Sequence, residues 1–386
     1  MRSARKQEVE SQYPPIGITE AVDEFAKRVI NHEALSRAYR KARSALSSSG
    51  GPRVVMIAGP TGVGKTTLAQ ALRRHAMERY AKEIIADPSC VPVIYGNAIP
   101  PNGASFSWKD FYIRLLERHG DVLTNRKLLV PRQSEIFPEL PAPSPLERSV
   151  TDALRRAVEN CMRLRKTRVL IIDEAHHLLM VNDPRRLEFQ FEALKSLTIE
   201  TDAVIVLLGT YRLLEIRDQS GQLVRRSEII HFPRYDIRVQ QDIEAFASVL
   251  ETFQSQLPLK RTPNFLADAE YFYLKTGGCV GILKDWLTRC LEQALIEGRK
   301  TIDREFAERY SLSNKSLKTI IEEAMNGEEK LSDVGVEKVE KLLKEGVPTE
   351  DDVATPSSTR KTGNKGRRVG ERLPVRDPVG GAYVAP

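Results

Sequence analysis

The stretch GPTGVGKTTLAQAL, residues 59–72, contains the pattern G-x-x-x-x-G-K-[ST] without a mismatch. Glycines at these spacings let backbone N–H groups close around a β-phosphate at the start of a helix, where the helix dipole favours negative charge. Lys65 is expected to contact the β- and γ-phosphates, and the Thr66 hydroxyl to bind Mg²⁺. The pattern therefore predicts a site for ATP and Mg²⁺. The residues expected to bind the nucleotide are Gly59, Pro60, Thr61, Gly62, Val63, Gly64, Lys65, Thr66 and Thr67.

A pair of acidic residues follows the apolar run VLII. An acidic side chain at the end of a buried strand is costly unless a cation accompanies it. Asp173 is therefore expected to hold Mg²⁺ through water, and Glu174 to polarise the water that attacks the γ-phosphate. The alternative is an acidic pair that caps the following helix. His176 and His177 are expected to be polar or packing neighbours, and neither is expected to be a metal ligand.

The next apolar run ends in Thr210. Catalytic side chains gather at the carboxyl ends of adjacent parallel strands, so Thr210 is expected to sense the γ-phosphate or position the water. A simple helix N-cap is the alternative. Arg225 and Arg226 precede a further short apolar run, and one of them is expected to complete a neighbouring subunit's site as an arginine finger. A solvated basic turn is the competing interpretation, and the sequence does not choose between the two arginines.

These side chains need a scaffold in which strands and helices alternate. Such alternation is typical of an α/β fold with a parallel sheet. Strands are expected at 54–57, at 91–95, in the run that starts at residue 168, and at 202–210. Helices are expected at 18–46 (one or two), 65–81, 108–119, 145–164 and 187–197.

The pattern changes to helices alone after residue 235, which predicts a second part of the chain. We expect a flexible arm over 1–17, a nucleotide-binding core with N-terminal helices over 18–235, and an all-helical lid over 236–323. Residues 324–386 combine an acidic stretch, an amphipathic helix at 334–344 and a basic tail. The tail has too little apolar content to fold alone, so it is expected to be mostly disordered.

Composition favours an ordinary cytoplasmic protein with a mild preference for polyanionic partners. The chain has 386 residues, a net charge of +7 and a pI near 9.1. Its four cysteines form no CxxC pair and no cluster with metal-ligand spacing, so reduced thiols are expected. We find no signal-peptide pattern and no apolar run of membrane-spanning length, and expect no membrane association.

The order of these motifs resembles that of AAA+ ATPases. Within that superfamily, residues 20–295 resemble the TniB/TnsC family of transposition ATPases, relatives of the phage Mu B protein. The resemblance is carried by AGPTGVGKTTL, VLIIDEAHHLL, VIVLLGTYRL and the segment NAIPPNGASFSWKDFYIRLLERHG. One departure concerns the lid, where related ATPases often place a sensor arginine. Gly281 stands in that place here, so either Lys284, one turn later, substitutes or sensing by the lid is absent.

The resemblance implies an ATPase that assembles with ATP into rings or helical filaments around duplex DNA. Such a homo-oligomer marks the target, recruits a DDE transposase and is cleared on ATP hydrolysis. A target-selection protein or a CRISPR complex is the implied further partner. Two other classes stay open, namely a signalling or scaffolding ATPase without a nucleic-acid role, and a helicase or loader. The string DEAH is found in one helicase class, but this chain lacks the second RecA-like domain that such a helicase needs.

DNA binding without sequence choice needs cationic groups near phosphates. The expected contacts are Trp108, Lys109 and Arg114, and beyond these Lys195 or the pair Arg185 and Arg186. Core packing is the alternative for Trp108. The basic tail between Arg360 and Arg376 is expected to bind DNA, to dock on a transposase, or simply to keep the chain soluble.

Overall fold

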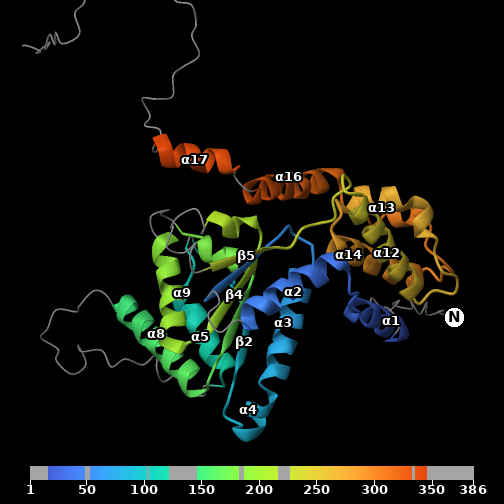
Figure 1. Cartoon of the computed structure of the whole chain (residues 1–386). Helices are drawn as coiled ribbons and strands as arrows, with labels where there is room; N and C mark the ends of the chain where they lie inside the picture. The colour runs from blue at the N-terminus through green and yellow to red at the C-terminus, as the bar shows by residue number, and fades with distance from the viewer. Residues whose placement is uncertain are drawn as a thin grey trace, which may run out of the picture. The chain divides into compact units, whose positions relative to one another are not determined.

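The computed structural model describes residues 16–47, 53–101, 103, 105–120, 146–181, 187–215, 227–332 and 335–345. At its centre is a five-stranded parallel sheet with the order β2-β3-β4-β1-β5 (Figure 1). The strands are β1 (Val54–Ala58), β2 (Val93–Asn97), β3 (Val169–Asp173), β4 (Val204–Gly209) and β5 (Ser227–His231). The expected α/β core with a parallel sheet is confirmed.

Helices cover both faces of the sheet. Because successive side chains of each strand point to opposite faces, the core has two halves, one on each face. Within β1, Val55 and Ile57 pack toward α2 (Glu33–Ser47) and α3 (Lys65–Arg79). Val54 and Met56 face the opposite way, into the half of the core that three other helices fill. These helices are α5 (Trp108–Arg118), α8 (Leu146–Leu164) and α9 (Leu187–Thr201). Because both faces of the sheet are apolar, the strands correspond to near-continuous hydrophobic runs in the sequence.

A helical region follows β5 and ends at residue 331; we call residues 240–331 the C-terminal helical region. Trp286 lies at its centre, 1% exposed, and its indole N–H donates to the Ala307 carbonyl at 2.8 Å. Near the other end of the chain, α1 (Ile16–Lys27) packs against α14, with Phe25 buried beside Phe253. The helices are α12 (Gln240–Gln256), α13 (Ala269–Thr276), α14 (Val280–Ile296), α15 (Arg304–Glu308) and α16 (Asn314–Leu331).

Two helices were not expected from the sequence. The short α4 (Ala81–Ala86) follows α3 directly, and α16 crosses the boundary that we had expected near residue 324. The chain divides into two compact units, residues 1–332 and 333–386, and the second contains the expected amphipathic helix as α17 (Val336–Glu345). The arm over 1–15 and the tail beyond 345 lie outside the described residues. No helix in the described part is both long and apolar enough to cross a bilayer.

Several histidines are buried in polar niches of this fold. His32 is 8% exposed, and its Nδ1 lies 2.9 Å from the Tyr235 hydroxyl. His231 ends β5, and its Nε2 lies 2.8 Å from the Tyr211 hydroxyl. Burial lowers the pKa of each of these histidines to about 4. Both are therefore neutral in the folded protein at pH 7.

These shifts predict acid sensitivity below pH 6.5. The unfolded chain takes up protons between pH 6.5 and 4 that the folded chain does not, so the free energy of unfolding should fall as pH falls through that window. For His32 the shift corresponds to about 3 kcal/mol. His32→Gln and His231→Gln should each flatten the dependence in urea denaturation measured from pH 7 to pH 4. A wild-type slope in both variants would contradict this origin of the acid sensitivity.

Candidate nucleotide site

The loop between β1 and α3 adopts a shape that only glycines permit at two positions. Gly62 and Gly64 have φ of +76° and +108°, in the left-handed region. Gly59 has no space for a side chain, because a Cβ there would lie 2.2 Å from the backbone oxygen of Phe232. The loop is thus held against the residue that follows β5, and its last glycine is the N-cap of α3.

Lys65, the first residue of α3, is buried at this loop. It is 6% exposed, and its Nζ donates to the carbonyls of Gly59 at 3.1 Å and Pro60 at 2.8 Å. Burial lowers the pKa of Lys65, while the charges of Glu174 and Asp173 oppose that shift. The acidic pair thus acts on the ammonium group through its charge, and the roles of all three side chains in binding a nucleotide stay predictions.

Asp173 ends β3 and is 2% exposed. Its Oδ2 accepts a hydrogen bond from the Tyr95 hydroxyl at 3.1 Å, and its Oδ1 accepts one from the Glu174 N–H at 2.9 Å. The Asp173 carboxylate is thus oriented by two donors and keeps lone pairs for a cation. Together with the exposed Thr66 hydroxyl at the start of α3, it forms an oxygen donor set of the kind that suits Mg²⁺. Tyr95 was not singled out from sequence, although β2 ends at the same sheet edge.

Glu174 is held in the left-handed region, with φ of +51°, and its carboxylate is partly exposed. Its Oε2 lies 3.2 Å from Nδ1 of His176, whose ring lies tilted by 41° against that of His177, with 4.2 Å between centroids. Burial, followed by the neighbouring His177, lowers the pKa of His176 to about 4. One ligand atom from each of these three residues falls within 4.8 Å of the others, a cluster compatible with a metal ion. That neither histidine is a metal ligand stays a prediction.

Thr210 follows β4 and is 7% exposed. Its Oγ1 is buried and has no hydrogen-bond partner among the described residues. The side chain makes no capping hydrogen bond to the short helix Tyr211–Leu213, so the hydroxyl does not serve as the N-cap considered above. A buried hydroxyl without a partner is a group that a bound ligand or water would satisfy.

The C-terminal helical region touches the glycine loop directly. The Gly281 N–H, at the start of α14, donates to the Gly62 carbonyl at 2.7 Å. A Cβ at Gly281 would lie 2.5 Å from that same oxygen. In this arrangement no side chain fits at residue 281, which gives a steric reason for the missing sensor arginine. Lys284, one turn on, is half-buried, and burial lowers its pKa.

A small cavity opens beside the loop, between α3, α14 and the segment before α2. Thr67 and Val63 line one wall, His32 and Ile30 another, and Lys284 reaches it from α14. These residues combine apolar surface with a few polar groups, as small-molecule sites usually do. The cavity adjoins the phosphate-binding loop and has a volume of about 40 Å³, which is room for only a few water molecules.

The residues expected to contact DNA differ from one another in their exposure and their partners. Trp108 packs with Phe106 and Phe111, at 5.5 and 5.7 Å between ring centroids, as core packing requires. Arg114 is exposed and bonds Asp110 at 2.7 Å, beside a cavity of about 350 Å³. Lys109 is exposed, whereas Lys195 is paired with Glu192 at 2.9 Å.

Four of the predicted arginines cannot be placed. Arg185, Arg186, Arg225 and Arg226 lie outside the described residues, as does the basic tail between Arg360 and Arg376. The arginine-finger role and the DNA-binding role of the tail therefore stay predictions.

Comparisons with known proteins were made for sequence and for structure. No curated protein matches the chain. Among solved structures, the Aeropyrum pernix ORC2 protein in ADPNP–ADP complexes is 19% identical, with 78% of this chain and 73% of that chain covered and a TM-score of 0.47. Domain III of the Thermotoga maritima replication initiation protein DnaA is 15% identical, with 76% and 95% covered and a TM-score of 0.41. Neither likeness is close enough to indicate what this chain binds.

A family model for the AAA domain matches residues 48–216. The matched range contains the glycine loop, Lys65, Asp173, Glu174 and Thr210, at the carboxyl ends of β1, β3 and β4. The parallel sheet, the loop and the match agree with one another. Residues 48–216 of this chain thus match the AAA domain and contain the phosphate-binding pattern of P-loop ATPases.

Proposed function

We propose that this AAA domain binds ATP with Mg²⁺ and hydrolyses it to ADP and phosphate. The observation that carries the proposal is the gathering of Lys65, the two acidic residues and the unpartnered Thr210 hydroxyl at one edge of the sheet. On binding, the phosphates would replace the Gly59 and Pro60 carbonyls as partners of the Lys65 ammonium group. Thr66 and Asp173 would hold Mg²⁺, which neutralises charge on the phosphates.

The hydrolytic step requires a base and an oriented water. Glu174 is in place to accept the proton of the attacking water, because its carboxylate is partly exposed and adjoins the Asp173 site. Neutral His176 lies against that carboxylate and limits its orientations. Thr210 Oγ1 would donate to the γ-phosphate or to the water, satisfying a group that is otherwise buried without a partner. Lys284 lines the small cavity beside the glycine loop, and we expect it to be the side chain of α14 that approaches a bound nucleotide.

The biological role that we propose is that of an ATP-dependent regulator of DNA transposition. In this role the chain oligomerises on duplex target DNA, links target selection to a DDE transposase, and is released on hydrolysis. The support comes from the resemblance of residues 20–295 to the TniB/TnsC family and from the basic net charge. A signalling switch without a nucleic-acid role and a helicase or loader are the competing functions, and they differ in whether and how DNA is bound.

Glu174→Gln tests the hydrolytic step. Because glutamine cannot accept the proton, ATP turnover should fall by about 100-fold or more while ATP affinity changes little. Steady-state turnover and binding of a fluorescent ATP analogue measure the two quantities. Glu200→Gln, at an exposed position of α9, is the matched control and should behave as wild type. Turnover equal to wild type in Glu174→Gln would remove Glu174 from this role.

Electron microscopy with duplex DNA tests the biological role. With a non-hydrolysable ATP analogue the protein should coat DNA as rings or filaments, and these should vanish without nucleotide. Lys65→Ala should form none, because it lacks the cation that the phosphates need. A wild-type protein that binds the analogue yet stays monomeric and off the DNA would contradict the proposed role and favour a signalling switch.

A further inference from the structure

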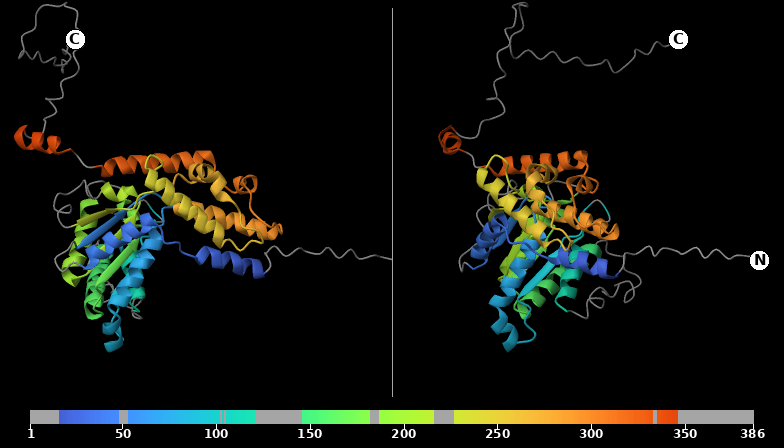
Figure 2. Two further views of the ribbon diagram at one scale, coloured as in Figure 1. Left: turned by 45° about the vertical axis from the view of Figure 1, so that its right-hand side comes forward. Right: turned by 90° about the vertical axis from the view of Figure 1, so that its right-hand side faces the viewer.

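Helix α16 extends from the C-terminal helical region to the core beside the nucleotide site (Figures 1 and 2). Near its start, Leu317 and Ile321 lie against Gly277, which follows α13. Near its end, Leu331 packs against the small cluster that contains Ala58 of β1 and Tyr211. Helix α16 thus joins the region of α13 and α14 to the strand ends where the site is built.

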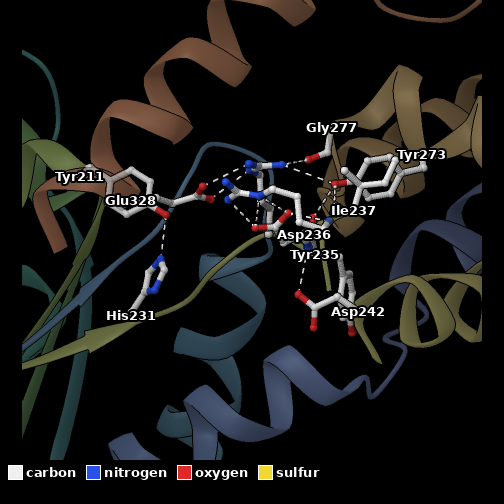
Figure 3. A network of polar contacts seen from close by, with 11 residues as sticks. Tyr211, His231, Tyr235, Asp236, Ile237, Asp242, Tyr273, Gly277 and Glu328 are labelled. Atoms are coloured by element: carbon white, nitrogen blue, oxygen red, sulfur yellow. Dashed lines mark hydrogen bonds and ion pairs between the residues drawn. The ribbon is translucent and has the colours of Figure 1, made fainter. Parts of the chain in front are cut away.

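The contact with the core is a close fit between Gly327 and Tyr211. A Cβ at Gly327 would lie 2.0 Å from Cγ of the Tyr211 ring, so only glycine allows the helix to lie there. Tyr211 is 4% exposed, follows Thr210 directly, and its hydroxyl is paired with His231 (Figure 3). The aromatic ring is thereby held between α16 on one side and β5 on the other.

A buried ion pair holds α16 in this position. Nε and Nη2 of Arg234 donate to the two carboxylate oxygens of Glu328 at 2.9 and 3.1 Å, and the Arg234 side chain is only 9% exposed. The same guanidinium donates to the Gly277 carbonyl at 3.4 Å and to the Tyr273 hydroxyl at 3.5 Å (Figure 3). Bidentate pairing specifies geometry as well as affinity, and a buried charge left without its partner is strongly unfavourable.

The same helix approaches the phosphate-binding lysine. Burial lowers the pKa of Lys65, and Glu323 of α16 is among the carboxylates whose charges oppose that shift. The charge of Glu323, which is exposed, acts on Lys65 only weakly, whereas the turn that carries Gly327 is in direct contact with Tyr211.

We propose that Arg234 and Glu328 are positioning residues for the ATPase site, acting through α16. The ion pair holds Gly327 against the Tyr211 ring. Tyr211 in turn fixes the backbone of Thr210, so that the Thr210 hydroxyl points toward the expected place of the γ-phosphate. This inference rests on the proposed role of Thr210. A purely structural role would affect folding alone. A positioning role predicts that disturbing the contact between Gly327 and Tyr211 slows hydrolysis in a protein that is folded and still binds ATP.

Gly327→Ala is the sharpest variant, because its added methyl group meets the Tyr211 ring directly. A purely structural contact would lower only the melting temperature, whereas a positioning contact also lowers the turnover number. Here the added methyl group displaces Tyr211, and the turnover number should fall by about 10-fold to 100-fold, since misplacing a catalytic group by 1 Å can cost that much. Binding of a fluorescent ATP analogue should stay within about 3-fold of wild type, as expected for a step made only in the transition state. Asn326→Ala, exposed on the same helix, is the control and should match wild type.

Glu328→Gln tests the ion pair, with Glu329→Gln on the exposed side as its control. Glu328→Gln should lower the turnover number, and the exchange of charges, Arg234→Glu with Glu328→Arg, should restore part of it. Turnover is measured with and without duplex DNA, per mole of protein shown to be folded by its melting curve. Thr210→Ala is measured alongside, and combining it with Gly327→Ala should add little further loss.

The outcomes separate this inference from the proposed function. If Thr210→Ala slows hydrolysis and Gly327→Ala does not, the positioning role is wrong while the site stands. If Thr210→Ala is as active as wild type, both the role of Thr210 and the inference that rests on it fail. A lower melting temperature with unchanged turnover in Gly327→Ala and Glu328→Gln would make α16 a purely structural element, which also overturns the inference.

Discussion

The burial of Lys65 and Asp173 at the same sheet edge is the constraint on which the rest of this structure depends. Each charge alone would be costly at 6% and 2% exposure, so each must be compensated by partners. Backbone carbonyls of the glycine loop compensate the lysine, and Tyr95 with the Glu174 N–H compensates the aspartate. A triphosphate with Mg²⁺ supplies opposite charges to both, which is why this edge suits a nucleotide.

Glycines at three positions allow another part of the chain to approach closely at or near the site. Gly59 lies against the Phe232 carbonyl, Gly281 against the Gly62 carbonyl, and Gly327 against the Tyr211 ring. In each case a methyl group would collide with an atom of the neighbouring element. The first two contacts bring the residue after β5 and the start of α14 against the glycine loop, and the third brings α16 against the residue that follows Thr210.

Several elements surround the proposed nucleotide site. The proposed ATP site has walls from the core and from α14, and its γ-phosphate edge is bordered by α16. Under the proposed role in transposition, this is the edge at which the state of the nucleotide would be converted into assembly on DNA or release from it.

The local chemistry of the site could be predicted from the sequence because each part of it is local in the chain. Three patterns each mark the end of a strand. They are the G-x-x-x-x-G-K-[ST] pattern, the acidic pair after a buried apolar run, and the threonine after the next apolar run. Alternating strands and helices imply that those ends share one edge. Helix α16 escaped prediction although Leu317, Ile321 and Ala324 recur at helical spacing, because the dipeptide Asn326-Gly327 and the acidic residues around it are typical of the end of a helical region.

What the tertiary structure alone decided are the pairings between distant segments. Arg234 and Glu328 are 94 positions apart, and Tyr95 and Asp173 are 78 apart, so no pattern within a window connects them. Likewise Gly281 looked in sequence like the loss of a sensor residue, whereas its contact with Gly62 shows that the space for a side chain is taken. Composition and periodicity specify which residues are buried and in which element. Which buried polar group meets which depends on how the elements pack, because complementarity of charge and shape is satisfied only in three dimensions.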